Sequence, residues 1–239
     1  MTPQSIRRRI LNTHRQLIRQ YGEPKRRLRR RDALSQLIAT ILSQNTTDVN
    51  TDRAYTNLRT QFPTWEAVRD APPRAIVRAI RSAGLANTKA PRIQAILRQL
   101  SKERGALSLE FLRKMPVDEA KDYLLRLKGV GPKTASIVLL FTFGKPAFPV
   151  DTHVFRVTHR LGLLSQPGKS VNTKMNREKA HEILERLVPP ALYYPLHINL
   201  IRHGREVCKA RKPRCEVCPL TDLCEYYAGT QDSLGSRKT

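Results

Sequence analysis

The chain has 239 residues, of which 44 are Lys or Arg and 20 are Asp or Glu, so its formal net charge is +24. This charge far exceeds what solubility requires, and it indicates nucleic acid as the first partner and an anionic membrane surface as the second. No run of about eighteen apolar residues is present, which excludes a membrane-spanning helix. The basic N-terminus also lacks the apolar segment of a secretory signal.

The predicted elements begin with an amphipathic helix over residues 1–21. Because the first acidic residue is Glu23, a mitochondrial transit peptide is an alternative interpretation of this segment. The basic run Lys25–Arg31 follows it. This run is either a solvated loop or an arm that contacts phosphates.

From Asp32 onward, apolar residues share one face of a predicted helix, which ends in a polar cluster at Ser43–Asp48. No segment alternates with the period of a strand. The sequence therefore predicts an all-α fold. Its further short helices, separated by Gly, Pro or polar residues, are Thr64–Asp70, Pro73–Ala83, Lys89–Leu100, Leu107–Lys114, Val117–Leu127, Arg177–Leu187 and Leu192–Gly204.

A tight turn between two helices is predicted at Leu127–Ala135. Gly129 and Gly131 bracket Val130, which allows both the chain reversal and the close approach of another backbone. Pro132 suits the first position of the second helix, where a missing N–H costs nothing. The free N–H groups at such a helix start can hold a phosphate. This pattern is typical of a helix-hairpin-helix DNA-binding element.

Asp151 follows the apolar helix that begins after this turn. Val154, Val157 and Leu161 share one face of the next predicted helix, so Asp151 stands at its N-terminus. Capping is the ordinary task of an aspartate at this place. A carboxylate held by backbone N–H groups is also fixed in direction, which suits a group that faces a developing positive charge.

All four cysteines lie between residues 208 and 224, as Cys208, Cys215, Cys218 and Cys224. A disulfide framework would spread its cysteines, so a reducing compartment and one metal site are expected. Structural zinc usually takes two close pairs of ligands, whereas only one C-x2-C pair occurs here, flanked by two single cysteines. The spacing favours a [4Fe–4S] cluster over zinc.

The hairpin, Lys133 within it and Asp151 eighteen residues later resemble the endonuclease III family of DNA glycosylases. The cysteine spacing is also similar to that of the family's [4Fe–4S] cluster. The resemblance implies two domains: a six-helix domain over residues 30–146 and a discontinuous iron–sulfur cluster domain over 1–29 and 147–226. The small and polar residues of the tail predict a disordered segment at 227–239. Lys133 and Asp151 would face each other between the domains.

The resemblance also implies site residues. Lys133 would attack C1′ of an extruded nucleotide, and Asp151 would stabilise the cationic sugar as the base leaves. Gln44 would fill the gap left by that base, and Leu85 would be an apolar wedge on the opposite strand. The remaining DNA contacts would be the hairpin residues Gly129, Val130 and Gly131 and the cluster-loop cations Lys209, Arg211, Lys212 and Arg214.

Each of these residues also has a simpler interpretation. Lys133 could be one more phosphate-binding cation, and the loop cations could merely offset the charge of the cluster. Gln44 could belong to an ordinary turn, and Leu85 to a helix cap around Gly84. Two positions depart from the family pattern: Lys128 replaces the common proline, and Pro132 the common arginine.

A lysine at position 133 implies a bifunctional DNA glycosylase and AP lyase, acting on oxidised pyrimidines such as thymine glycol in double-stranded DNA. Two alternatives remain: a uracil or thymine mismatch glycosylase on the same scaffold, and a protein that binds damaged DNA without chemistry. A monomer that binds no membrane and works in the cytoplasm, at the nucleoid of a prokaryote, is expected.

Overall fold

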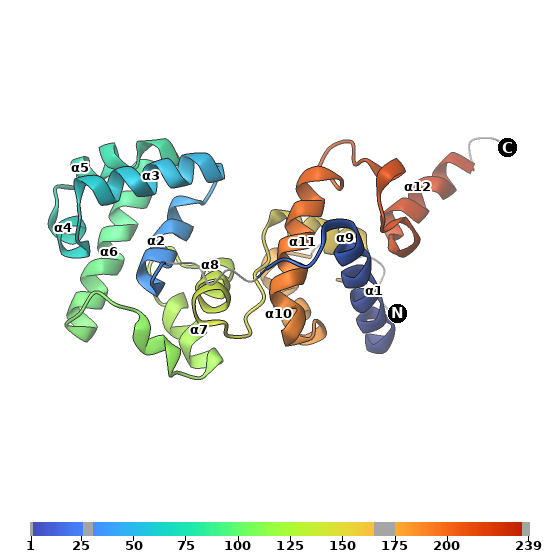
Figure 1. Ribbon diagram of the computed structural model, residues 1–239, viewed down its shortest axis with the longest axis horizontal. Helices are drawn as coiled ribbons and strands as arrows, with labels where there is room; N and C mark the ends of the chain where they lie inside the picture. The colour runs from blue at the N-terminus through green and yellow to red at the C-terminus, as the bar shows by residue number, and fades with distance from the viewer. Residues whose placement is uncertain (1, 26–30, 165–174, 236–239) are drawn as a thin grey trace. The chain divides into compact units, whose positions relative to one another are not determined.

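A computed structural model describes residues 2–25, 31–164 and 175–235. Within these residues every regular element is helical and no strand occurs, as the all-α prediction requires. No helix of the described part is long and apolar enough to cross a bilayer. The α-helices (Figure 1) are α1 (Pro3–Tyr21), α2 (Ala33–Leu42), α3 (Asp48–Gln61), α4 (Trp65–Asp70), α5 (Pro73–Ala79), α6 (Ala86–Arg104), α7 (Val117–Leu125), α8 (Pro132–Val138), α9 (Thr152–Arg160), α10 (Arg177–Leu187), α11 (Tyr193–Glu206) and α12 (Glu225–Gly235).

The chain divides into two compact units, one of residues 28–145 and one of residues 1–27 with 146–239. The central domain predicted from the sequence has the bounds 30–146. The basic run expected at Lys25–Arg31 falls mostly on residues 26–30, which lie outside the described residues.

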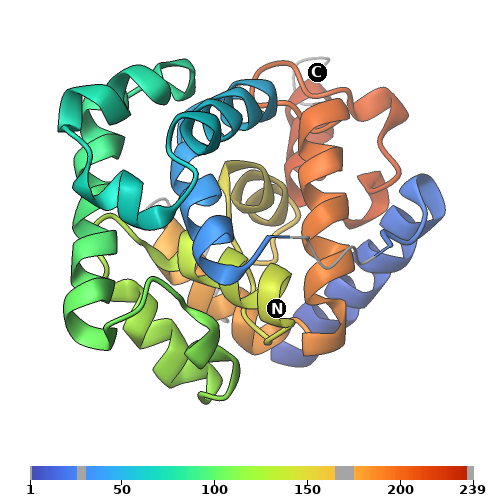
Figure 2. The same cartoon turned by 60° about the vertical axis from the view of Figure 1, so that its left-hand side comes forward.

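Helix α2 forms the core of the unit of residues 28–145, and all ten of its residues are buried. It contacts α3, α6 and α8, which lie around it in the views of Figures 1 and 2. The helix starts where the sequence predicts, because the carboxylate of Asp32 accepts a hydrogen bond from the Ser35 N–H at 2.9 Å. The sequence predicts one apolar face, whereas the structure buries every side of this helix, including the polar residues Ser35, Gln36 and Thr40.

Helix α11 is the centre of the other unit and contacts both α9 and α1. The approach of α9 and α11 is close at Gly204, where an added Cβ would lie 2.8 Å from the Cβ of His153. Only a glycine permits this separation, so Gly204 sets the distance between the two helices. This distance matters for function because α9 begins directly after Asp151.

Helix α3 was not predicted from the sequence. Its buried residues are Thr51, Ala54 and Leu58, of which only one is a large apolar side chain, so its hydrophobic periodicity is weak. The N-cap provides the better signal, since the Thr47 hydroxyl accepts from the Asn50 N–H at 3.3 Å.

The prediction of a helix over Leu107–Lys114 was too long. The structure has only a 3-10 turn at Glu110–Arg113, because Gly105 ends α6 with a φ of 67° and Pro116 begins the next element. So short a connection leaves room for one tight turn.

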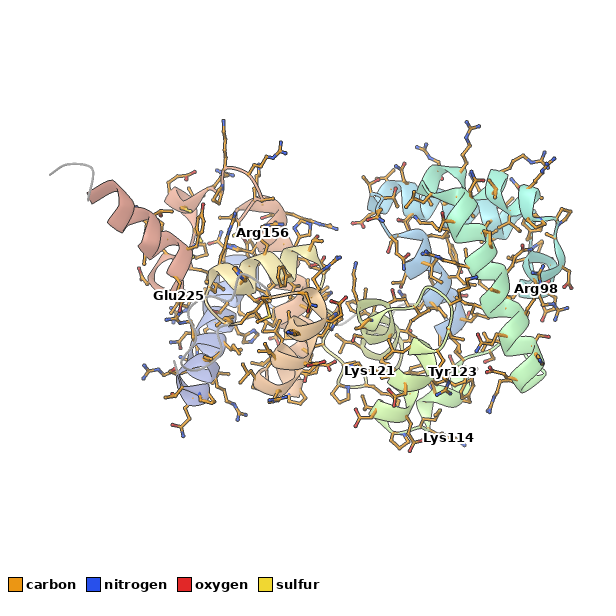
Figure 3. All side chains as sticks on the ribbon, turned by 180° about the vertical axis from the view of Figure 1, so that it is seen from behind. Arg98, Lys114, Lys121, Tyr123, Arg156 and Glu225 are labelled. Carbon is orange, nitrogen blue, oxygen red and sulfur yellow. The ribbon has the colours of Figure 1, made fainter. Side chains whose placement is uncertain are left out.

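The expectation of a disordered tail at residues 227–239 differs from the structure, in which α12 continues to Gly235. The start of this helix is anchored by Arg9 of α1, which donates to the Glu225 carboxylate and to the Leu161 carbonyl, both at 2.9 Å. Figure 3 labels Glu225 at this start. Residues 236–239 lie outside the described residues.

Candidate functional site

The predicted hairpin is present between α7 and α8. Its turn closes with a hydrogen bond from the Val130 N–H to the Leu127 carbonyl at 3.1 Å. Gly129 adopts a φ of 80°, a region that side chains with a Cβ rarely enter. Val130 is only 6% exposed, so its side chain offers little surface to a partner.

The hairpin backbone is free to bind an anion. Among the described residues, no acceptor receives the N–H groups of Gly129 and Gly131. Gly131 is the N-cap of α8, and Pro132 occupies the first helical position as predicted. The side chain of Arg92, from α6, lies against Gly129, where an added Cβ would be 2.7 Å from the Arg92 Cδ. The Arg92 side chain of helix α6 therefore packs against the turn.

Lys133 is the second residue of α8 and is half-buried. Among the described residues of its own unit, no hydrogen-bonding or ionic partner of the amine occurs, and the next two residues, Thr134 and Ala135, are buried. The lysine thus stands in the first turn of a helix beside buried residues, with an uncommitted amine, an arrangement that suits a nucleophile. The same position would also suit the alternative role of Lys133 as a cation that only binds phosphate.

Asp151 belongs to the other unit and caps α9 as predicted. Its Oδ1 accepts from the N–H groups of His153 and Val154, at 2.9 and 2.8 Å. Both cap bonds end on the same oxygen, so the cap does not use Oδ2. The residue is only 8% exposed. One carboxylate oxygen therefore fixes the helix, and the other remains able to face a positive charge.

Two buried histidines hold the segment that leads to Asp151, and sequence reasoning did not find them. His181 Nδ1 donates to the Phe148 carbonyl at 3.0 Å, while its Nε2 accepts from the Val150 N–H at 3.3 Å. Since a carbonyl only accepts and an N–H only donates, these two bonds define a neutral ring with its proton on Nδ1. His197 Nδ1 donates to the Pro149 carbonyl at 2.9 Å in the same way.

The two turns predicted to contact DNA belong to the unit of residues 28–145. Gln44 is half-buried, and its amide nitrogen lies 3.5 Å from the hydroxyl of Thr134 on α8. Leu85 is 57% exposed and precedes α6 with a left-handed φ of 49°. An apolar side chain this exposed, on a strained backbone, is typical of a contact residue.

The four cysteines surround one pocket in the unit that contains α9 and α11. Among the described residues, no three His, Cys, Asp or Glu side chains gather as ligands of a single metal ion. The four cysteines line one pocket, which fits a group that reaches all four of them. Protein donors point at the sulfurs, among them Arg160 at 3.3 Å from Cys208 Sγ and the Leu220 N–H at 3.4 Å from Cys218 Sγ. Cys224 accepts from the backbone N–H groups of Tyr226 and Tyr227. Such donors are typical of an iron–sulfur environment.

Three of the four thiols are not poised to ionise by themselves. Burial raises the pKa of Cys218 to about 11, and it also raises the pKa of Cys215 and of Cys224. Cluster ligands are thiolates, so assembly must release these protons. The fold of the pocket and its occupation are consequently coupled.

The cluster loop between Cys208 and Cys215 carries the four predicted cations, and all four are exposed: Lys209, Arg211, Lys212 and Arg214. Arg160 of α9 fixes the loop by donating to the Lys209 and Ala210 carbonyls at 2.8 and 3.1 Å. Arg156, labelled in Figure 3, donates to the Cys208 carbonyl at 2.9 Å. No sequence pattern indicated these two arginines.

Comparison with known families gives two matches. Residues 38–190 match the model of the HhH-GPD superfamily base excision DNA repair proteins, a range that includes Lys133 and Asp151. Residues 208–224 match the iron-sulfur binding domain of endonuclease III, and this range begins and ends at the outer cysteines of the pocket.

Individual relatives agree with these matches. Endonuclease III of Thermotoga maritima is 37% identical over 196 residues, covering 82% of this chain and 84% of that protein. A protein of Arabidopsis thaliana is 41% identical over 196 residues, but the chain spans only 64% of its length. A trapped endonuclease III–DNA covalent intermediate has a TM-score of 0.75 at 30% identity, covering 97% of this chain and 99% of that one. A thermostable thymine-DNA glycosylase has a TM-score of 0.74 at 25% identity, with coverages of 95% and 98%.

Proposed function

The chain belongs to the HhH-GPD superfamily and, within it, to the endonuclease III family, and from this premise we propose a bifunctional DNA glycosylase and AP lyase for oxidised pyrimidines. The coarser activity follows from membership: the protein is a DNA-binding glycosylase of base excision repair with a [4Fe–4S] cluster. The finer proposal concerns the substrate, the lyase step and the residues that perform them.

Lys133 carries the proposal. It stands in the first turn of the hairpin helix beside buried residues, and among the described residues of its unit its amine has no partner. In its neutral form the amine attacks C1′ of the extruded nucleotide, and the base leaves with the electron pair of the glycosidic bond. The sugar ring then opens to an imine that joins Nζ to C1′. Loss of a C2′ proton breaks the C3′–O bond and leaves a nick 3′ to the lesion, and water releases the lysine.

Asp151 is the second member of the proposed pair. Its Oδ1 is committed to the N-cap of α9, which fixes the direction of the carboxylate. Its second oxygen would take the proton from the amine and face the cationic sugar as the base departs. Support also comes from the covalent endonuclease III–DNA intermediate among the similar structures.

The proposed DNA contacts are those of the hairpin, the two turns and the cluster loop. The backbone of Gly129, Val130 and Gly131 would hold a phosphate, and the exposed cluster-loop cations would follow the strand. Gln44 and Leu85 belong to the turns that would enter the duplex. Cys208, Cys215, Cys218 and Cys224 would be the cluster ligands, and the cluster would hold the loop in place.

A second candidate substrate is a mispaired base. The thymine-DNA glycosylase at 25% identity favours it, since this scaffold also removes thymine. A panel of duplexes that carry thymine glycol, uracil opposite guanine or thymine opposite guanine separates the two candidates. We expect excision and strand cleavage without alkali on thymine glycol. Excision confined to the mismatches, or cleavage that requires alkali, would contradict the proposal.

The protein is proposed to act as a monomer on double-stranded DNA in the compartment that holds the DNA, the cytoplasm of a prokaryote. Light scattering of the protein on a duplex with one lesion tests the stoichiometry. One protein per lesion is expected, and a dimer in both states would contradict it.

A further inference from the structure

Lys89 is a buried cation that the proposed mechanism does not use. Its side chain, in the first turn of α6, is 1% exposed. The ammonium donates three hydrogen bonds, to the carbonyls of Leu42 at 2.7 Å, Gln44 at 2.6 Å and Ala83 at 2.8 Å. Three donors thus meet three acceptors, which is the full capacity of an ammonium group. The acceptors come from the ends of α2 and of the 3-10 turn Arg81–Ala83.

Burying an ammonium group costs free energy unless hydrogen bonds replace its lost hydration. Desolvation lowers the pKa of Lys89 to about 8, and no carboxylate contributes to the shift. The carbonyls at the ends of helices carry partial negative charge and lack intrahelical partners. Lys89 satisfies three of them at once and so joins two segments that are about forty residues apart in the chain.

Each joined segment leads into a strained residue. Asn45, directly after Gln44, has a φ of 54°, and Leu85, two residues after Ala83, has a φ of 49°. Both side chains are exposed. A left-handed residue other than glycine costs about 1 kcal/mol or more, and it persists only where the surroundings hold it. The Lys89 bonds connect the backbones of both turns directly.

The two amide side chains of the turn after α2 differ in exposure. Gln44 is half-buried and its amide nitrogen approaches Thr134 at 3.5 Å, whereas Asn45 is exposed. Asn45 is therefore the amide available to a partner. It can donate to and accept from a base edge, as the gap opposite an extruded nucleotide requires.

We propose that Lys89 is a positioning residue that holds Asn45 and Leu85 as one rigid pair of probes for the strand opposite the lesion. This inference rests on the proposed function, because it presumes that the two turns enter damaged duplex DNA. Lys89 itself touches no DNA. It acts by holding the turns before the DNA arrives, so that binding does not have to order them.

Gln94 is a matched control on the same helix. It is also 1% exposed, and its amide nitrogen lies near three carbonyls, those of Val68, Arg69 and Ala71 at 3.0, 3.3 and 2.8 Å. Its acceptors lie at the end of α4 and away from both turns. Lys89→Met and Gln94→Met each remove such a network from α6, so a merely structural role would affect both variants alike.

The experiment measures binding to two duplexes, one undamaged and one with a tetrahydrofuran abasic analogue opposite 2-aminopurine. For Lys89→Met we expect the preference for the abasic duplex to fall about tenfold or more, and the fluorescence change of 2-aminopurine to vanish. Affinity for the undamaged duplex should stay the same, because phosphate contacts supply it. Gln94→Met should keep the preference. Equal losses in both variants, or no loss in Lys89→Met, would overturn the inference.

Two further measurements separate the possible failures. If the wild-type protein shows no preference for the abasic duplex, the proposed function is wrong, whatever the role of Lys89. If Lys89→Met does not fold, the wild-type Nζ resonance is followed by ¹⁵N NMR instead. Three carbonyl bonds should make the ammonium protons exchange slowly, and the signal should shift with the abasic duplex but not with the undamaged one. An unprotected signal, or one that responds equally to both duplexes, would contradict the positioning role.

Discussion

Asp151 combines two tasks that make different demands on one carboxyl group. The cap of α9 needs a hydrogen-bond acceptor, and the structure supplies it with Oδ1 alone. The chemistry needs a negative charge, which only an ionised carboxylate provides. Asparagine caps a helix about as well as aspartate does but carries no charge. The two tasks can therefore be separated by one substitution.

We expect Asp151→Asn to keep its fold and its affinity for an abasic duplex, while single-turnover excision falls on the order of a hundredfold or more. Asp32→Asn is the matched control, because Asp32 caps α2 in the same way. Excision by this control should stay near the wild-type rate. An Asp151→Asn variant that excises normally, or that loses binding as much as turnover, would refute the assigned role.

Lys89 makes a pH prediction of its own. Burial lowers its pKa from 10.5 to about 8, so the folded protein loses this proton at a lower pH than the unfolded chain does. Between these values the unfolded state binds more protons, and stability therefore rises with pH, by up to about 1.4 kcal/mol per unit. Urea unfolding at several pH values should show this slope in the wild-type protein and not in Lys89→Met. The same slope in both would exclude the assignment.

Among the elements, the contact between α9 and α11 decides where Asp151 stands. An alanine at Gly204 would place its Cβ 2.8 Å from the Cβ of His153, near the start of α9. The clash involves the root of a side chain and not a flexible end, so the helix itself must move.

Gly204→Ala is expected to lower the excision rate about tenfold or more, since small displacements of a catalytic group are costly. Gly229→Ala in α12 is the control, because an added Cβ there meets nothing within 4 Å. Excision kinetics and melting of both variants check the prediction. If Gly204→Ala retains wild-type kinetics, the spacing of α9 and α11 does not position Asp151.

The sequence predicts some of the elements but not the contacts between them. The hairpin, the cap at Asp151 and the fully buried α2 follow from local rules of glycine geometry, capping and periodicity. Helix α3 was missed because its buried face is built mostly from small residues. The contacts of Lys89, His181 and Arg160 join segments far apart in the chain, and no local pattern contains such information.

For the whole molecule, the charge of +24 predicts how binding responds to salt. Each neutralised phosphate contributes about 0.9 to the slope of log affinity against log salt. Replacing the exposed Lys209, Arg211, Lys212 and Arg214 with glutamine should reduce that slope by up to about 4 units. Binding to undamaged duplex from low to moderate salt measures it. A slope that does not change would show that the cluster loop makes no phosphate contacts.

The central claim is that Lys133 is the nucleophile, and borohydride trapping tests it most directly. Borohydride reduces the imine between Nζ and C1′ to a stable amine, so a labelled duplex with a single thymine glycol becomes covalently attached to the protein. We predict a trapped complex with the wild-type protein and none with Lys133→Gln. Trapping that survives Lys133→Gln, or no trapping by the wild-type protein on thymine glycol or on an abasic site, would contradict the account.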